Sequence, residues 1–197
     1  MSVEPISSLV LGTRNPHKVR EIARLLEPAG IAVVPLPPGI ELPPETGETF
    51  EANALPKARA AAAATGLAAI ADDSGIESEA LDGAPGVRSA RYGGPDATDD
   101  QNVDKLLREV PSGSRLRYVC ALAYADPRDG GERVFYGYCR GRLDARPRGS
   151  GGFGYDPAFL PDEGEGDRTM AELDDAEKDA ISHRGQAVRA FAQWLRR

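Results

Sequence analysis

The chain has 197 residues and a mass of 21.0 kDa, which suits a single domain over 1–197, because domains commonly contain about 100 to 200 residues. Lysine and arginine number 24 against 31 aspartates and glutamates, and the net charge is −7. This charge disfavours a general nucleic-acid binder, which needs a basic field. An anionic ligand must therefore be bound by local groups.

The composition also bears on location. Residues 1–5 contain no basic region and no apolar stretch typical of an export signal, and no apolar run approaches the roughly 20 residues of a membrane span. We therefore expect a cytoplasmic protein with no membrane partner. Cys120 and Cys139 lie in strand-like runs, where we expect small buried side chains and not a disulfide or metal ligands.

Strands and helices alternate in the first half of the chain, and a hairpin follows later, which predicts an α/β protein with a mixed sheet. The expected elements, in chain order, are a strand at 8–12, a helix from 16 to about 26, a strand at 31–35, a loop at 35–47, a helix at 50–65 between Thr49 and Gly66, a strand at 69–71 that ends in Asp72-Asp73-Ser74-Gly75, a helix at 99–109, strands at 116–125 and 133–140 joined through Asp129-Gly130-Gly131, a glycine-rich loop at 149–156 and a closing helix at 182–197.

The turn before the first helix is a candidate phosphate site. Asn15 is placed to cap the helix, Pro16 suits its first position, and Lys18 falls in the first turn, where backbone N–H groups have no partner within the helix. A polyphosphate could accept from these groups and from the ammonium together. A solvated lysine is the alternative. The Walker spacing of glycines and lysine does not occur here.

Two adjacent carboxylates, Asp72 and Asp73, follow the strand at 69–71. They repel each other and must be separated, hydrogen-bonded or neutralised by a cation. Since successive side chains of an extended backbone point to opposite faces, one carboxylate can enter a site while the other braces the turn. We choose Asp73 for the site; a plain Asp-Ser-Gly turn is the alternative.

Two further segments carry polar or aromatic groups of interest. Asn53 and Lys57 share a face with Phe50 near the start of a helix, which favours a polar site, although Lys57 could instead extend past the apolar surface to solvent. The loop at 149–156 contains a formal dinucleotide-binding pattern, but Tyr155-Asp156-Pro157 cannot open the helix that this pattern requires. Its glycines would instead allow close approach to a flat ligand, with Phe153 or Tyr155 for stacking, or simply a packed turn.

The start of the closing helix places cationic groups at the positive end of a helix dipole. Ser182 can cap the helix, and His183 and Arg184 fall in its first turn. The arginine could donate to purine O6 and N7, whereas adenine presents an amino donor at that edge.

Eight short motifs occur together and in order from about residue 9 to the last helix, and this set resembles the noncanonical purine nucleoside triphosphate pyrophosphatases, also called inosine or xanthosine triphosphate pyrophosphatases. The motifs are Thr13-Arg14-Asn15-Pro16-His17-Lys18, Glu45-Thr46-Gly47, Asn53 with Lys57, Asp72-Asp73-Ser74-Gly75, Gly83-Ala84-Pro85-Gly86, Ser89-Ala90-Arg91-Tyr92, Gly151-Gly152-Phe153-Gly154-Tyr155-Asp156-Pro157 and Ser182-His183-Arg184-Gly185-Gln186-Ala187.

The resemblance implies an elongated mixed sheet flanked by helices in two lobes with the active-site cleft between them, a homodimer, and a required Mg²⁺ ion. The implied activity is hydrolysis of inosine, deoxyinosine and xanthosine triphosphates (ITP, dITP, XTP) to the monophosphate and pyrophosphate, which clears deaminated purines from the nucleotide pool. A pyrophosphatase for other modified bases and a nucleotide-binding regulator without turnover are the alternatives.

Site roles follow from the same resemblance, residue by residue. Asp73 would be the proton acceptor, and Glu45 and Asp73 would hold the metal. The substrate-binding residues would be Thr13, Arg14, Asn15, Pro16, His17 and Lys18 for the triphosphate, Ser74, and Phe153, Gly154, Tyr155, Asp156, Lys178, His183 and Arg184 around the nucleoside.

Two positions depart from the pattern of the family. Pro44 occupies a position that is often acidic, which leaves Glu45 as the choice for the metal, with Glu41 or Glu48 as substitutes. Arg14 replaces a commoner small residue, and we expect it to add a phosphate contact.

Overall fold

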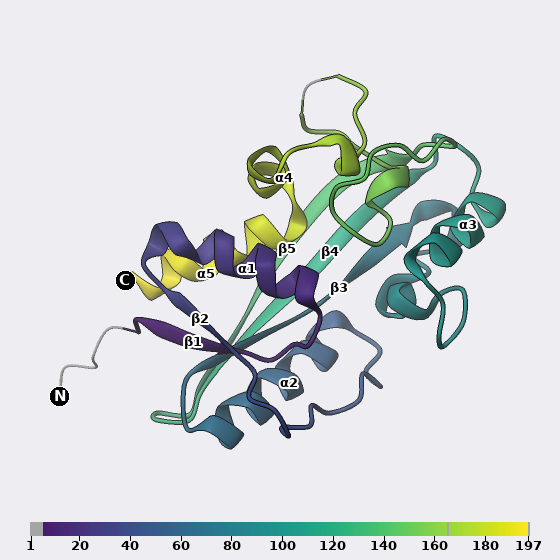
Figure 1. Cartoon of the computed structure of the whole chain (residues 1–197). Helices are drawn as coiled ribbons and strands as arrows, with labels where there is room; N and C mark the ends of the chain where they lie inside the picture. Colours follow the sequence, from purple (N-terminus) through teal and green to yellow (C-terminus); the bar gives the residue numbers. More distant parts are fainter. Residues whose placement is uncertain (1–5, 165, 197) are drawn as a thin grey trace. The chain divides into compact units, whose positions relative to one another are not determined.

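The computed structural model describes residues 6–164 and 166–196, so the amino-terminal segment 1–5 and the last residue of the predicted closing helix lie outside the described residues. A six-stranded sheet in the order β2-β1-β3-β4-β5-β6 is flanked by helices (Figure 1), which confirms the α/β prediction. The strands are β1 (Ser8–Leu11), β2 (Ala32–Pro35), β3 (Ala69–Ser78), β4 (Arg115–Asp126), β5 (Gly131–Leu143) and β6 (Phe159–Pro161), and the helices are α1 (Pro16–Leu26), α2 (Phe50–Thr65), α3 (Asp99–Glu109), α4 (Asp175–Ile181) and α5 (His183–Leu195).

The sheet is mixed. β1 pairs in parallel with β2 and with β3, and β5 pairs antiparallel with β6. The neighbours β4 and β5 are joined by the turn 127–130, which is too short for the crossover that a parallel pair requires, so this pair is antiparallel. The predicted hairpin is thus present, with both strands longer than expected.

The chain packs as two compact units, in agreement with the two lobes that the resemblance implies. The first unit contains the chain up to Asp73, then Ala121–Tyr136, then the chain from Ala187, and the second contains Ser74–Cys120 and Gly137–Gln186. The chain passes between the units within β3, β4 and β5. The break in β3 falls between Asp73 and Ser74, so two neighbouring residues of one motif belong to different units.

In the first unit, helices cover both faces of the strands (Figure 1). Leu9 and Leu11 of β1 and Ile22 of α1 are completely buried. The small alanine side chains of α2 let this helix pack close to the end of β1. A Cβ atom at Gly12, directly after β1, would lie 3.1 Å from the Lys57 carbonyl oxygen of α2. On α5, Phe191 packs against Tyr124 and Phe135, at ring distances of 5.7 and 5.5 Å, so this helix docks as its apolar face predicts.

β3 is longer than the sequence indicates. It was expected to stop before Asp72, but the strand continues to Ser78 with Ile76 completely buried. The acidic pair does not force a turn, because Asp72 and Asp73 each have a partner in the first unit, as the site geometry shows. The short elements β6 and α4 were not predicted.

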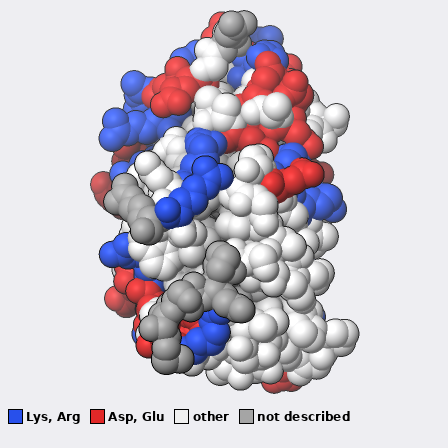
Figure 2. Space-filling model, turned by 90° about the vertical axis from the view of Figure 1, so that its left-hand side faces the viewer, with Lys and Arg blue, Asp and Glu red and all other residues white. Residues whose placement is uncertain are grey.

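Charged residues of both signs are intermixed on the face that Figure 2 shows. In the upper part of the face in Figure 2, lysines and arginines lie among aspartates and glutamates, and the lower part is mainly uncharged. Within residues 6–164 and 166–196, no helix combines the length and the apolar character that crossing a membrane would take.

Candidate active site

The turn before α1 has the geometry expected of a helix cap. The Asn15 side-chain oxygen accepts from the N–H groups of His17 at 2.9 Å and of Lys18 at 3.4 Å, and Pro16 is at the first helical position. The Thr13 hydroxyl accepts from the Asn15 N–H at 3.2 Å. The first turn of α1 is therefore held in a fixed conformation by its own polar side chains.

Lys18 is not a solvated surface lysine. Its Nζ lies 3.1 Å from Asp72 Oδ2, and its side chain is only 13% exposed. The Asp72 side chain is completely buried, so the ion pair is shielded on the carboxylate side. The ammonium group is held close to the acidic pair, where a polyphosphate would meet it.

The two adjacent carboxylates have different partners, as the alternation of an extended strand predicts. Asp72 pairs with Lys18, whereas Asp73 Oδ2 accepts a hydrogen bond of 2.9 Å from Asn53 Nδ2. Asp73 is 4% exposed. The repulsion between the two neighbours is thus reduced by separate partners on separate elements.

Lys57 lies between these groups and a loop. Its Nζ donates to Glu45 Oε1 at 2.5 Å and to the Asp72 carbonyl oxygen at 2.8 Å. The residue is 6% exposed, which excludes the alternative that its ammonium extends to solvent. The lysine therefore ties the Glu45 loop to β3.

Burial raises the pKa of Asp73 to about 6. The negative charge of Glu45 acts in the same direction, and Lys57, the Asn53 hydrogen bond and Lys18 act in the opposite direction. A carboxyl group whose pKa lies close to neutral is suited to accept a proton in a reaction near pH 7.

The carboxylates of this site suit a metal ion that binds together with a phosphate-containing substrate. Glu45 and Asp73 interact electrostatically, whereas Glu41 and Glu48 are exposed. In the part of the chain that the structure describes, no cluster of three or more histidine, cysteine or acidic side chains could hold a metal. Mg²⁺ is commonly bound by one or two carboxylates together with waters and substrate phosphates. Glu45 and Asp73 fit such an ion.

In the second unit, Arg184 and Phe153 lie together. Arg184 is 1% exposed, and its guanidinium donates to the Ser74 hydroxyl at 2.7 Å and lies 5.5 Å from the centre of the Phe153 ring. Lys178 Nζ lies 5.2 Å from the same ring. These residues, far apart in sequence, thus form one cationic and aromatic cluster.

Asp156 organises the glycine-rich loop. Its Oδ2 accepts from the Phe153 N–H at 2.9 Å and from Lys178 Nζ at 2.7 Å, and its Oδ1 accepts from the Tyr118 hydroxyl at 3.0 Å. A Cβ atom at Gly152 would lie 2.0 Å from Asp156 Oδ2, and Gly152 has a φ of +69°. The glycine is therefore required for the loop to wrap around this carboxylate.

His183 lies at the start of α5. Ser182 caps this helix, as the sequence predicts, and its hydroxyl accepts a hydrogen bond from the Gly185 N–H at 3.0 Å. The imidazole stacks on the Tyr118 ring, with centroids 4.6 Å apart and an interplanar angle of 6°. The histidine is only 5% exposed, so its orientation is fixed by this packing.

Tyr155 is not placed for stacking on a ligand. It is 4% exposed, belongs to the apolar core of the second unit, and donates its hydroxyl to the Ser89 carbonyl oxygen at 2.8 Å. The sequence could not choose between Phe153 and Tyr155. The structure leaves the partly buried Phe153 as the aromatic candidate, because a core ring has no face for a ligand.

Arg14 has an unexpected role. Its guanidinium donates to the Ile40 carbonyl oxygen at 2.6 Å and approaches that of Pro37 at 3.5 Å. One amino group of Arg14 therefore binds the loop that carries Glu45, and the expected phosphate contact stays a prediction.

The chain is similar to known proteins over nearly its whole length. The model of the Ham1 family matches residues 9–194. This chain belongs to the Ham1 family. A dITP/XTP pyrophosphatase of Cutibacterium acnes is 48% identical, with 94% of this chain and 95% of that protein covered, and one of Shigella flexneri is also 48% identical, with 97% and 99% covered. A solved Ham1 structure from Coxiella burnetii has a TM-score of 0.84 at 40% identity and covers 96% of this chain and 98% of its own.

Some contacts of this Ham1 protein had no signal in the sequence. The Tyr118 hydroxyl reaches Asp156, and Asp99 accepts from the Gly154 N–H at 2.6 Å. Alternation along β4 indicates that Tyr118 points inward. No local pattern indicates which loop it meets, because that depends on tertiary packing.

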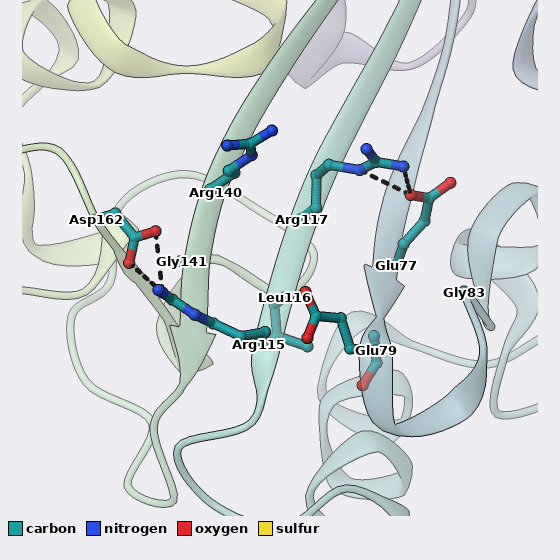
Figure 3. A pocket seen from close by; sticks show the side chains of 10 residues that line it. Glu77, Glu79, Gly83, Arg115, Leu116, Arg117, Arg140, Gly141 and Asp162 are labelled. Carbon is teal, nitrogen blue, oxygen red and sulfur yellow. Dashed lines mark hydrogen bonds and ion pairs between the residues drawn. The ribbon is translucent and has the colours of Figure 1, made fainter.

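A depression of about 490 Å³ in the second unit lies outside the predicted site (Figure 3). Arg115 pairs with Asp162 and Arg117 with Glu77 along its walls, and Arg140 comes from the neighbouring strand. No residue that lines this depression is among the predicted site residues. Its arginines therefore provide matched surface controls for the site.

Proposed function

We propose that this chain hydrolyses noncanonical purine nucleoside triphosphates, with ITP, dITP and XTP as substrates, to the monophosphate and pyrophosphate. The relatives named dITP/XTP pyrophosphatases support this, since they are matched over nearly their full length. The observation that carries the proposal is Asp73, a buried carboxyl group with a raised pKa, beside Glu45 and two lysines. The protein would thereby clear deaminated purines from the nucleotide pool.

Asp73 acts as the general base. It accepts a proton from a water molecule, whose oxygen attacks the α-phosphorus and breaks the bond to the bridging oxygen that leaves with pyrophosphate. Lys18 and the N–H groups of the first turn of α1 bind the negative phosphates. Glu45 and Asp73 would hold Mg²⁺, which when bound supplies charge stabilisation for the pyrophosphate leaving group.

The residues of the second unit contact the nucleoside. Arg184 donates to the 6-oxo group of hypoxanthine or xanthine, and Phe153 offers its ring to the base. Adenine places an amino donor where the arginine needs an acceptor, and two donors that face each other disfavour adenine nucleotides. Guanine shares the 6-oxo group, so its rejection would require a group near C2 that disfavours the 2-amino donor and tolerates the 2-oxo group of xanthine.

The remaining parts of the proposal concern assembly and location. The enzyme acts as a homodimer in the cytoplasm, without a nucleic-acid or membrane partner. The net charge of −7 supports the lack of a nucleic-acid partner. Analytical ultracentrifugation at several protein concentrations tests the dimer directly.

The test is to mix the purified protein with Mg²⁺ and, separately, inosine, xanthosine, guanosine and adenosine triphosphates, and to measure the products. We expect pyrophosphate and monophosphate from the first two. Release of orthophosphate would show a different bond cleavage, and binding without any product would favour a regulator. Chelation of Mg²⁺ should abolish turnover but leave the melting temperature unchanged, because the protein supplies too few ligands for a structural metal.

A further inference from the structure

Two buried asparagines occupy the same position in two helices. Asn53 is the fourth residue of α2 and Asn102 is the fourth residue of α3. Each accepts a hydrogen bond of 2.7 Å from a glycine N–H of the preceding loop, Gly47 for Asn53 and Gly93 for Asn102. They are 3% and 2% exposed. Both side chains therefore fasten a loop onto the start of a helix.

The amide nitrogens of the two asparagines have different partners. Asn102 donates to the Ala90 carbonyl oxygen at 3.3 Å, a purely structural contact, whereas Asn53 donates to Asp73 at 2.9 Å and approaches the Gly47 carbonyl oxygen at 3.4 Å. The orientation of the Asn53 amide is determined chemically. The Gly47 N–H can only donate, so the oxygen must face it, and the nitrogen must face the carboxylate.

The glycine of the first loop is part of the same arrangement. A Cβ atom at Gly47 would lie 2.7 Å from Ala52 Cβ and 2.8 Å from Asn53 Oδ1. The absence of a side chain at this position therefore allows the loop to approach Asn53. Glu45 lies two residues earlier in the chain, so a bond to Gly47 also restricts where this carboxylate can lie.

We propose that Asn53 is a positioning residue, which through one amide group fixes the carboxylate plane of Asp73 and the loop that carries Glu45. This inference rests on the proposed function, because Asp73 and Glu45 act in that reaction. Asp73 and Glu45 come from different segments of the chain. Hydrogen bonds from one helix to Asp73 and to the loop at Gly47 hold these two segments in fixed relative positions. Misplacement of a reacting group by about 1 Å can cost about a hundredfold in rate.

Two variants separate the two hydrogen bonds. Asn53→Asp keeps an oxygen for the Gly47 N–H but loses the donor to Asp73, and Asn53→Ala loses both. Asn102→Ala is the matched control, because it removes the same loop contact at the same helical position without affecting a carboxylate of the site.

For both Asn53 variants we expect kcat to fall by about 10- to 100-fold while KM for inosine triphosphate changes by less than about threefold. Amide hydrogen exchange at Gly47 should remain protected in Asn53→Asp and become fast in Asn53→Ala. Asn102→Ala should lower the melting temperature as much as Asn53→Ala does and leave kcat unchanged.

Wild-type turnover is measured in parallel, so that two failures can be distinguished. If the wild-type protein does not hydrolyse inosine triphosphate, the proposed function fails. If it does, and Asn53→Asp retains kcat within about twofold of wild type, the positioning role is overturned. An equal loss of kcat in Asn102→Ala would likewise overturn it, because the effect would then belong to loop fastening in general.

Discussion

The polar cluster of the first unit and that of the second unit both bury charge, but they balance it differently. In the first unit, Lys18 and Lys57 are paired with Asp72 and Glu45 within about one hydrogen-bond length. In the second, Asp156 pairs with Lys178 at 2.7 Å and also holds the loop, whereas Arg184 donates to the Ser74 hydroxyl, and both cations lie near the Phe153 ring. The first cluster is suited to a polyphosphate and a cation, and the second to a flat, neutral base.

This difference implies that rate and base selectivity should be separable by mutation. In the proposed function, groups of the first unit would act on the phosphate chain, which all nucleotides share. Groups of the second unit would act on the base edge, which differs among nucleotides. Single substitutions can therefore test whether each cluster has only one of these roles.

The largest effect is expected for Asp73→Asn. Loss of the proton acceptor should lower kcat by about 10³-fold or more for inosine and xanthosine triphosphates alike, since general-base catalysis commonly contributes about 10²- to 10⁴-fold and the same group would hold the metal. Nucleotide affinity, measured by calorimetry, should be retained. Full turnover in this variant would remove Asp73 from its proposed role.

A smaller and more selective effect is expected for Arg184→Met. The preference for inosine over adenosine triphosphate, measured as the ratio of kcat/KM values, should fall by about 10- to 100-fold because a buried donor to the base is lost. Arg115→Met removes an exposed arginine of the same unit and is the control. A change in kcat without a change in preference would contradict the division of roles between the clusters.

Asp73→Asn should also stabilise the protein in the absence of a metal. The pKa of Asp73 is raised from its ordinary 3.8 to about 6, so its protonated form stabilises the fold below pH 4, and this contribution is lost as the pH rises through 6. The neutral amide should therefore raise the free energy of unfolding at pH 8 by at most about 3 kcal/mol, which is seen as a higher melting temperature. At pH 4 the substitution should make little difference.

Asp126→Asn is the control, for which we expect the opposite change in melting temperature at pH 8. Hydrogen bonds from Arg128 lower the pKa of Asp126 to about 2. Its ionised form therefore stabilises the fold above pH 4, and the amide variant should melt at a lower temperature at pH 8. Thermal unfolding at the two pH values measures both variants. A lower melting temperature for Asp73→Asn at pH 8 would show that burial of this charge is not unfavourable.

The smallest effect is expected for Arg14→Ser. The guanidinium binds the Ile40 carbonyl oxygen, so its loss should loosen the loop that carries Glu45 and raise the Mg²⁺ concentration for half-maximal activity by about two- to fivefold. Arg59→Ser removes an exposed arginine that pairs with Glu132 and should have no effect. If instead the KM for nucleotide rises at saturating Mg²⁺, Arg14 contacts phosphate as the sequence suggested.

Local patterns determined much of the fold. The caps Asn15, Thr49 and Ser182, the helix stop at Gly66 and the apolar face of α5 were predicted, because each depends on residues within a few positions of one another. The resemblance also named candidate site residues from short motifs, and their roles stay predictions. Ranges such as α2 (Phe50–Thr65) and α3 (Asp99–Glu109) agree with the prediction to the residue.

Only the tertiary structure decided which polar groups meet. Asn53 bonds Asp73 across twenty positions of chain, Arg14 bonds Ile40 across twenty-six, and Arg184 bonds Ser74 across 110. The same packing extends β3 through its acidic pair and places Tyr155 in the core. Hydrogen bonds and burial between distant segments depend on how the elements pack, and the sequence of one segment does not carry that information.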